Sequence, residues 1–339
     1  MYNSLISISI YAILIFILLY KIKFKSNNNE FISKDTTMYL KGYSIVIIAI
    51  HHFCLNISNP GILFVFTKIG YLGVSVFLFL SGYGIAKSFQ KKGLNNFIAK
   101  RLKKVYIPFV IINIITMILY YIFLNDKYSF TNIILYASGI KLLDAVLWYV
   151  KTILIFYIAF YLLFKYLSVN KAMKMLFFIS IAYPIICYFL NLGNAWYASS
   201  FNFFTGTAMV FYKDKIDKFL YERYTKCLIL FSSLFFIFVF GNFHFNNNDL
   251  LKVSFCYFSS IFFIFIVIQI LYKVELNNMP MLLVGTISYE VYLIHMKVYN
   301  IVFPKFNTAI YIIPYIIVVF ALSRLFNKFY NNAIKKFTT

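Results

Sequence analysis

Long apolar blocks separated by short polar joints dominate this sequence. Each block is roughly 17 to 22 residues long, the length that an α-helix needs to cross the hydrocarbon core of a bilayer. The chain of 339 residues is 62% apolar and 12% charged, and its mean hydropathy is +0.81. The blocks are apolar on all sides, whereas strands of a membrane β-barrel alternate between polar and apolar residues. These features predict an all-α fold, that of a polytopic helical membrane protein.

We expect about eleven transmembrane helices, with one N-terminal helix added to a core of ten. Their predicted ranges are 3–20, 43–58, 69–89, 105–124, 146–165, 172–190, 196–212, 226–241, 253–272, 281–302 and 308–326. The second of these is short, and Gly206 is expected to interrupt the seventh. The chain then divides into an N-terminal helix with its linker (1–38), a membrane domain (39–326) and a basic tail (327–339).

The formal charge of +22 is distributed unevenly between the two sides of the predicted helices. Suppose that the joints after the first, third, fifth, seventh and ninth helices, together with the C-terminus, face the cytoplasm. That side, with the adjoining helix ends, then holds 25 of the 32 Lys and Arg residues. Because Lys and Arg concentrate on the cytoplasmic side, we expect the N-terminus outside and the C-terminus inside. The charge therefore favours contact with a lipid bilayer over binding of nucleic acid.

Ionisable residues within the apolar blocks are the first candidates for a functional site, because burying them in a membrane costs free energy. His51 and His52 end one block, and Glu290 and His295 lie in a later one. Successive helical residues differ by about 100°, so the two adjacent histidines cannot both point equally into one cavity. We expect one to be catalytic or ligating and the other to face outward or to form an interhelical hydrogen bond. His52 shares a helical stripe with Lys41 and Ser44, which favours His52.

Small residues and a basic loop follow the histidine pair. Gly70, Gly73, Gly82 and Gly84 in the third block predict close approach of neighbouring helices. The next joint carries Lys100, Arg101, Lys103 and Lys104, and on a regular helix the three lysines would share one face. Such a face suits a polyanion, either the phosphates of coenzyme A or lipid headgroups.

Several motifs in order resemble the acyltransferase 3 family of integral membrane acyltransferases, which includes bacterial O-acetylases of cell-surface glycans. The first is a basic residue, ten residues and then a histidine, as in "KGYSIVIIAIHH". The others are "GVSVFLFLSGYGI", which contains Ser81, "RLKKVYIP", "LWYVKTILIFYIAFYL" with Trp148, "SSFNFFTGTAMVFYK" and "ISYEVYLIH" with Tyr289. The resemblance covers residues 39–326. Lys41 and Lys104 stand where the family more often has Arg, which keeps the charge but loses the bidentate fork.

The resemblance implies transfer of an acyl group, most often acetyl, from cytosolic acyl-CoA to a hydroxyl of an envelope glycan or glycolipid. Imidazole titrates near neutral pH, so His52 is expected to be the general base. Ser44, Lys41 or Glu290 would orient it, and His295 would relay a proton or bind the acceptor. Lys41, Arg101, Lys103 and Lys104 would hold the phosphates of acetyl-CoA, which is a substrate and not a resident cofactor. His51, Ser81, Trp148 and Tyr289 are expected to support the site, and no metal is expected.

Other functions stay open at this point. A proton-coupled transporter could also carry Glu and His within its helices, and a non-catalytic membrane scaffold would need neither. The unrelated O-acyl type of membrane acyltransferase also uses a histidine. His244 and Asp249 match the H-x4-D spacing of glycerolipid acyltransferases, but they lie in an outer loop, so we interpret that match as coincidence. The setting expected is the plasma membrane of a bacterium, and the identity of the acceptor is not predicted.

Overall fold

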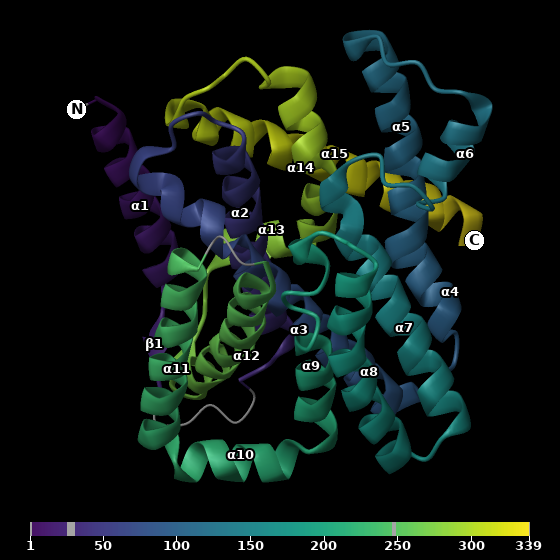
Figure 1. Ribbon diagram of the computed structural model, residues 1–339. Helices are drawn as coiled ribbons and strands as arrows, with labels where there is room; N and C mark the ends of the chain where they lie inside the picture. The colour runs from purple at the N-terminus through teal and green to yellow at the C-terminus, as the bar shows by residue number, and fades with distance from the viewer. Residues whose placement is uncertain (1, 26–30, 246–248, 339) are drawn as a thin grey trace.

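The structure is a computed structural model that describes residues 2–25, 31–245 and 249–338 (Figure 1). Its longer helices are α1 (Tyr2–Leu19), α2 (Lys34–Leu55), α3 (Phe66–Lys92), α5 (Ile107–Leu124), α7 (Trp148–Tyr166), α8 (Val169–Phe189), α11 (Tyr224–His244), α12 (Asp249–Lys273), α14 (Ser288–Val302) and α15 (Ile312–Thr338). Shorter ones are α4 (Phe97–Arg101), α6 (Phe130–Ala137), α9 (Asn202–Phe211), α10 (Lys213–Glu222) and α13 (Met279–Thr286).

Two strands and several single turns complete the described part of the chain. The strands β1 (Lys23–Phe24) and β2 (Val274–Glu275) pair antiparallel, and Lys25 forms an ion pair with Glu275 at 2.5 Å. The turns are η1 (Gly61–Val65), η2 (Leu102–Tyr106), η3 (Ala145–Leu147), η4 (Asn194–Trp196) and η5 (Ala309–Tyr311). Of these, η2 is a π-helix and the rest are 3₁₀-helices.

The helices confirm an all-α polytopic membrane protein, but not the number expected. Among the described residues, eight helices are long and apolar enough to cross a bilayer, or nine if α13 and α14 form one bent span. Within α1, the apolar stretch is Ile8–Leu19, which is shorter than a membrane span and so is not one of the eight. The predicted span 196–212 also falls short, because its regular part is α9, whose ten residues reach only about 15 Å.

Two local predictions are wrong in a way that the structure explains. Gly206 does not interrupt a helix, because α9 runs through it and begins only at Asn202. The second span is not short, since α2 begins at Lys34, where the Ser33 side chain caps it by accepting a hydrogen bond from the Thr36 N–H at 3.1 Å. Both concern helix ends, which hydropathy locates poorly. The predicted tenth span contains a bend of 75° between α13 and α14.

Glycines allow the helices that carry the site to touch. A Cβ atom on Gly206 of α9 would overlap the backbone carbonyl of Phe79 on α3, and one on Gly82 would overlap that of Phe203. Helix α2 approaches α13 in the same way, with Gly42 against Met281 and Gly285 against Met38. The small-residue prediction for the third block is therefore correct at Gly82, whereas Gly84 faces open space. In Figure 1, α10 lies across the ends of α9 and α11.

Replacing Gly206 with Ala should destabilise the protein by about 1–3 kcal/mol, because the added methyl group would push α9 away from α3. The measurement is thermal unfolding of the purified protein in detergent, followed by circular dichroism. Gly84→Ala is the matched control on α3, where a Cβ meets nothing within 4 Å, and it should leave the midpoint unchanged or raise it slightly. Equal midpoints for the two variants would contradict the close contact between α3 and α9.

Candidate functional site

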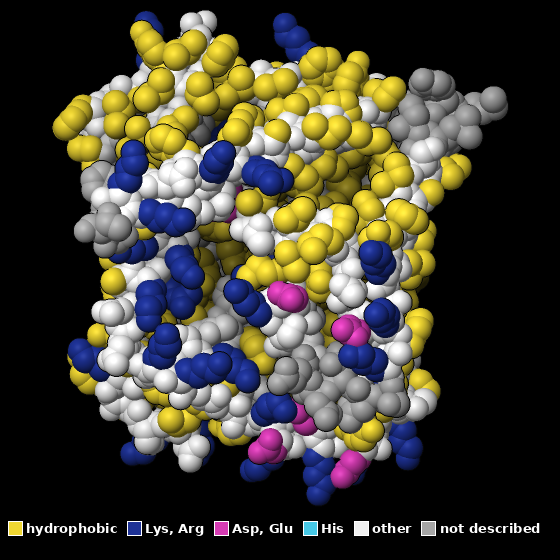
Figure 2. Space-filling model, turned by 180° about the vertical axis from the view of Figure 1, so that it is seen from behind, with side chains coloured by type: hydrophobic (Ala, Val, Ile, Leu, Met, Phe, Trp, Pro, Cys, Tyr) yellow, Lys and Arg dark blue, Asp and Glu magenta, His cyan; other side chains and the backbone are white. Residues whose placement is uncertain are grey.

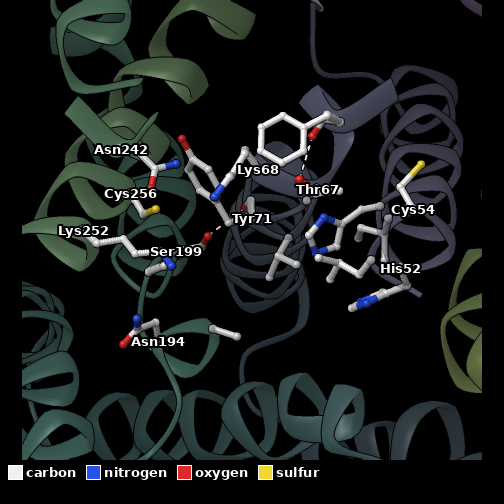
Figure 3. A pocket seen from close by; sticks show the side chains of 18 of the residues that line it. His52, Cys54, Thr67, Lys68, Tyr71, Asn194, Ser199, Asn242, Lys252 and Cys256 are labelled. Atoms are coloured by element: carbon white, nitrogen blue, oxygen red, sulfur yellow. Dashed lines mark hydrogen bonds between the residues drawn. The ribbon is translucent and has the colours of Figure 1, made fainter. Parts of the chain in front are cut away.

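Two cavities lie end to end inside the bundle. The first, which we call the histidine cavity, has a volume of about 560 Å³ and is lined by His51 and His52 (Figure 3). The second, which we call the basic cavity, has a volume of about 650 Å³ and is lined by Lys41, Arg101, Lys103, Lys104 and Glu290. Figure 2 shows Lys and Arg side chains gathered around hollows on one face of the molecule, below a surface that is mostly apolar.

One face of α2 connects the two cavities. Lys41 lines the basic cavity, His52 lines the histidine cavity, and Ile48 between them lines both. The eleven-residue separation of Lys41 and His52 corresponds to about 16 Å along a helix. The stripe predicted from the sequence is therefore present, except that Ser44 is buried and belongs to the described lining of neither cavity.

Three imidazole rings form a row at the histidine cavity. The ring of His52 lies between the other two, with centroids 4.7 Å from His51 and 5.0 Å from His295. His51 and His52 belong to the end of α2, while His295 comes from α14 and is fully buried. The helical bundle thus brings together three of the four histidines of the chain.

The hydrogen bonds of His295 determine its tautomer. Its Nδ1 lies 2.8 Å from the carbonyl oxygen of Tyr292 and 3.2 Å from that of Val291. A carbonyl oxygen only accepts hydrogen bonds, so Nδ1 carries the proton and Nε2 presents a lone pair. That Nε2 is buried and has no hydrogen-bond partner among the described residues. His295 can therefore accept a proton from a group beside it, and the ring of His52 is such a neighbour.

His51 also lines the histidine cavity, and it forms an interhelical hydrogen bond of the kind expected for one of the two adjacent histidines. Its Nδ1 donates a hydrogen bond to the carbonyl oxygen of Phe66 at 2.7 Å, which again leaves Nε2 as the acceptor. The ring packs on Gly70 of α3, where a Cβ atom would overlap it. The cavity is wide enough at the end of α2 to meet two neighbouring faces of that helix.

The basic cavity receives its charge from the segment that joins α3 to α5. The guanidinium of Arg101 stacks on the rings of Phe97 at 5.4 Å and Tyr157 at 5.1 Å, and its Nε is buried without a partner in the described structure. Lys103 and Lys104 follow in η2. Lys104 also lines a smaller adjoining cavity together with Lys91, Lys92 and Lys100, whereas Lys103 is not among the described lining of that cavity.

Glu290 lies apart from the histidines. It lines the basic cavity, is 8% exposed, and its Oε1 accepts a hydrogen bond from the Asn327 side chain at 2.6 Å. The structure therefore does not bring Glu290 to His52 or His295, and the predicted orientation of His52 by Glu290 has no geometric support. Ser44 and Lys41 are likewise not among the ring contacts of His52.

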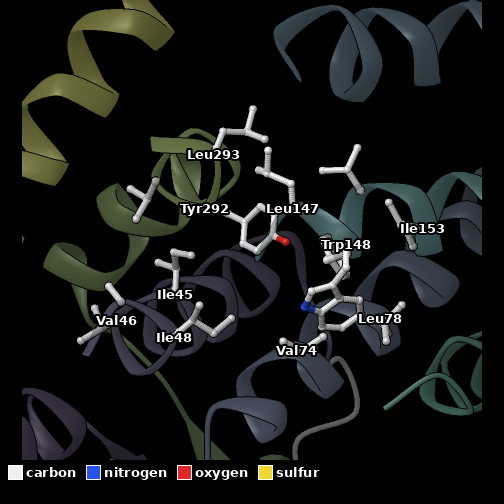
Figure 4. Packing of buried hydrophobic residues seen from close by; sticks show 14 of the residues in the cluster. Ile45, Val46, Ile48, Val74, Leu78, Leu147, Trp148, Ile153, Tyr292 and Leu293 are labelled. Atoms are coloured by element: carbon white, nitrogen blue, oxygen red, sulfur yellow. The ribbon is translucent and has the colours of Figure 1, made fainter. Parts of the chain in front are cut away.

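Apolar and aromatic side chains separate the two cavities. Ile48, Val74 and Tyr292 line both, and we call these three residues the partition (Figure 4). The hydroxyl of Tyr292 donates a hydrogen bond to the carbonyl of Val146, which holds the ring in place. Sequence reasoning missed Tyr292, although it lies one helical turn before His295 and so on the same face of α14.

The supporting residues predicted from the motifs divide between the cavities. Trp148 lines the histidine cavity, whereas its neighbour Tyr149 lines the basic cavity. Ser81 lines the basic cavity and is hydrogen-bonded to Tyr149. Tyr289 also lines the basic cavity, and its hydroxyl donates to the carbonyl of Val105 at 2.8 Å. Of the predicted residues, only Ser44 and His295 are absent from the described linings of both cavities, and His295 reaches the site through its contact with the ring of His52.

Comparison with known families agrees with the resemblance seen in the motifs. The family model described as "Acyltransferase domain" matches residues 38–327, which is most of the chain. This chain belongs to the acyltransferase 3 family. No curated protein and no solved structure gives a match. The family and the helices together identify an integral membrane acyltransferase.

A buried ion pair supports the histidine site of this acyltransferase, and the sequence analysis overlooked it. Lys297 of α14 donates to Oδ2 of Asp144, and their side chains are only 5% and 10% exposed. Asp144 Oδ1 also accepts from Tyr120 at 3.1 Å and, at 3.4 Å, from Asn300. Lys297 lies two residues after His295, and Asp144 lies just before η3 and α7. The ion pair therefore fixes the part of α14 that carries His295 to the start of α7. The sequence feature that could have indicated this ion pair is the presence of Lys297 inside an apolar block, because a lysine there needs a partner.

Asp144→Asn should destabilise the acyltransferase by about 3–5 kcal/mol, because it leaves the ammonium of Lys297 buried without a counter-charge. The double variant Asp144→Asn with Lys297→Met removes both charges and should recover a large part of that loss. Thermal unfolding in detergent measures both, and the two single variants complete a double-mutant cycle. If the single and double variants lose equal stability, the pair does not stabilise the fold as argued.

Proposed function

We propose that this acyltransferase transfers an acyl group, most simply acetyl, from cytosolic acyl-CoA to a hydroxyl of a glycan or glycolipid outside the plasma membrane of a bacterium. The observation that carries the proposal is the pair of cavities that meet at the partition, one basic and one lined by histidines. A reaction whose two substrates come from opposite sides of a membrane needs two such compartments.

The basic cavity suits the donor. Coenzyme A carries several phosphate charges, and Lys41, Arg101, Lys103 and Lys104 surround one space that contains a single acidic residue among its described lining, Glu290. The smaller cavity lined by Lys91, Lys92 and Lys100 adjoins it through Arg101 and Lys104, so the cationic surface continues past the opening. In the proposed orientation this surface faces the cytoplasm, as the distribution of Lys and Arg favours.

The histidine cavity suits the reaction. The acceptor hydroxyl attacks the thioester carbonyl while His52 takes the hydroxyl proton, which forms the new C–O bond and a tetrahedral intermediate. That intermediate collapses with cleavage of the C–S bond, and the thiolate of coenzyme A leaves and is protonated. His295 supports this step, because its ring centroid lies 5.0 Å from that of His52 and its Nε2 has no hydrogen-bond partner among the described residues, so it is available to accept a hydrogen bond from the imidazolium that forms.

A transporter has one observation in its favour. The bend of 75° between α13 and α14 resembles the discontinuous helices that form ion and substrate sites in transporters. In an acyltransferase the same bend has another use, because it places Glu290 and Tyr289 on the basic cavity and His295 beside His52. The variants below separate the two functions, since transport requires no consumption of a thioester.

His52→Ala should retain the fold and bind acetyl-CoA, but lose acyl transfer by at least about 100-fold, as expected for removal of a general base. Transfer is measured as release of free coenzyme A by the purified protein in the presence of acceptor-containing membranes. His244→Ala is the matched control, because His244 is exposed at the end of α11 and lines neither cavity. Transfer at the wild-type rate by His52→Ala would show that another residue is the base. Loss of transfer in His244→Ala would instead revive the H-x4-D interpretation, part of which lies outside the described residues.

Val74→Phe should block transfer while leaving acetyl-CoA binding intact, because the larger ring would fill the partition between the cavities. Binding is measured by isothermal calorimetry and transfer by coenzyme A release. Val74→Ala is the companion variant, and it should keep transfer. If Val74→Phe transfers as fast as the wild type after its fold has been checked by thermal unfolding, the acyl group does not pass between Ile48, Val74 and Tyr292.

A further inference from the structure

The side of the histidine cavity that lies opposite His52 carries neutral polar groups that the proposed chemistry does not use. Figure 3 shows Asn242, Cys256 and Ser199 on that side, which we call the opposite wall. Asn242 belongs to α11 and Cys256 to α12, while Ser199 precedes α9. The cavity of about 560 Å³ therefore has a second polar side, and its size is that of a site for a small molecule.

The hydroxyl groups of Tyr71 and Ser199 in this lining are bonded within the protein. The Ser259 hydroxyl donates to the carbonyl oxygen of Cys256 at 3.1 Å, so it accepts a hydrogen bond from the Tyr71 hydroxyl at 2.7 Å. The Ser199 hydroxyl donates to the carbonyl oxygen of Tyr71 at 2.8 Å. These bonds tie α3 to α12 and to the segment before α9. The opposite wall is therefore held in one arrangement before any ligand binds.

Asn242 differs from these hydroxyl groups, because part of its hydrogen-bonding capacity is not used by the protein. The residue is 2% exposed, and its Oδ1 is buried without a partner among the described residues. Asn113, Asn202 and Gln269 also have an unpartnered side-chain oxygen in the described structure. However, each of those three donates a hydrogen bond through its nitrogen and lines neither cavity. Of these four amides, only Asn242 adjoins a space that a ligand can occupy.

The amide of Asn242 favours one chemical class of ligand group. Its nitrogen only donates and its oxygen only accepts, and the two exchange places when the group rotates. A hydroxyl both donates and accepts, so it can pair with either end of the amide. A carboxylate only accepts and an ammonium only donates, so each fits one end alone. A neutral hydroxyl group is therefore the partner that suits Asn242 in both orientations.

We propose that Asn242 is an acceptor-binding residue, and that it binds a hydroxyl of the acceptor other than the one that His52 activates. The acceptor is then a polyol, such as a sugar, that has one hydroxyl at His52 and another at the opposite wall. Asn242 thereby contributes to the choice of the hydroxyl that is acylated. This inference rests on the proposed function, because it names a specificity-determining residue of the same site.

The tryptophans of the chain make binding in this cavity measurable. The sequence has two, and Trp148 lines the histidine cavity while the ring centroid of Trp196 lies 6.3 Å from that of Trp148. Intrinsic fluorescence of the full chain, in a neutral detergent without a sugar headgroup, therefore reports binding there. The probes are methyl α-glucoside and tetrahydropyran-2-methanol, which has a similar ring but a single hydroxyl. Both are neutral, so the charges of Lys68 and Lys252 in the same lining do not distinguish them.

Methyl α-glucoside should bind the wild type at least about 10-fold more tightly than the probe with one hydroxyl, because only the glucoside can bond to both sides of the cavity at once. Asn242→Leu should weaken binding of the glucoside about 5-fold, the effect of losing one hydrogen bond. Asn170→Leu is the matched control, at an exposed position of α8 that lines neither cavity, and it should keep the wild-type affinity.

The stability of Asn242→Leu separates a ligand-binding role from a structural one. Leucine removes a buried oxygen that has no partner among the described residues, so the midpoint of thermal unfolding without ligand should rise by a few degrees. Asn202→Leu provides the contrast, because it removes an amide that donates to the Ser260 hydroxyl at 2.9 Å, and it should lower the midpoint.

Some outcomes overturn the inference without touching the proposed function. These are equal binding of the two probes, or binding of the glucoside by Asn242→Leu with wild-type affinity, while the wild type still binds and consumes acetyl-CoA. A lower unfolding midpoint for Asn242→Leu, or failure of this variant to fold, would also overturn it and assign the amide to the stability of the fold. Failure of the proposed function has a different signature, since acetyl-CoA would then neither bind by calorimetry nor release coenzyme A in the wild type.

Discussion

The close approach of α2 to its neighbours is the contact on which the site depends. Gly70 and Gly73 let α3 lie against His51 and Ile48, and Gly42 lets the backbone of α13 approach on another side. In a bilayer, apolar surface alone gives helices little reason to associate, so contact at this distance supplies dispersion energy that larger residues would forfeit. Because α2 carries Lys41, Ile48 and His52, fixing this helix fixes both cavities and the partition between them.

Hydropathy predicted most of the helices because membrane-spanning segments must satisfy their own backbone and are apolar over a fixed length. It could not predict the bend between α13 and α14 or the short α9, since neither changes the apolar composition that hydropathy records. His52 and the basic cavity were predictable, because a histidine in an apolar block and a run of lysines are visible in one dimension. The row of three imidazoles was not, since His295 reaches His52 only through the packing of α14.

The buried ionisable groups of this protein differ in how fully they are partnered. Those that stabilise the fold have partners for their charges, and those at the candidate site do not have them all. Asp144 and Lys297 neutralise each other and are surrounded by further hydrogen bonds from Tyr120 and Asn300. The ionisable groups at the candidate site are less completely partnered: among the described residues, neither Nε of Arg101 in the basic cavity nor Nε2 of His295 beside His52 has a hydrogen-bond partner. Burial of an unsatisfied polar atom lowers stability, so its persistence is expected mainly where a substrate completes the hydrogen bonds.

The π-helix η2 has a consequence for how the basic cavity arose. A π-helical turn holds one more residue than an α-helical turn, so it changes the rotational phase of everything before it relative to α5. With that phase, Arg101 and Lys104 line both the basic cavity and the smaller adjoining one, while Lys103 lines only the first and Lys100 only the second. The arrangement is therefore encoded by the number of residues in the segment as much as by their identities. A chain one residue shorter here could keep every lysine and still present a different set of charges to the same space.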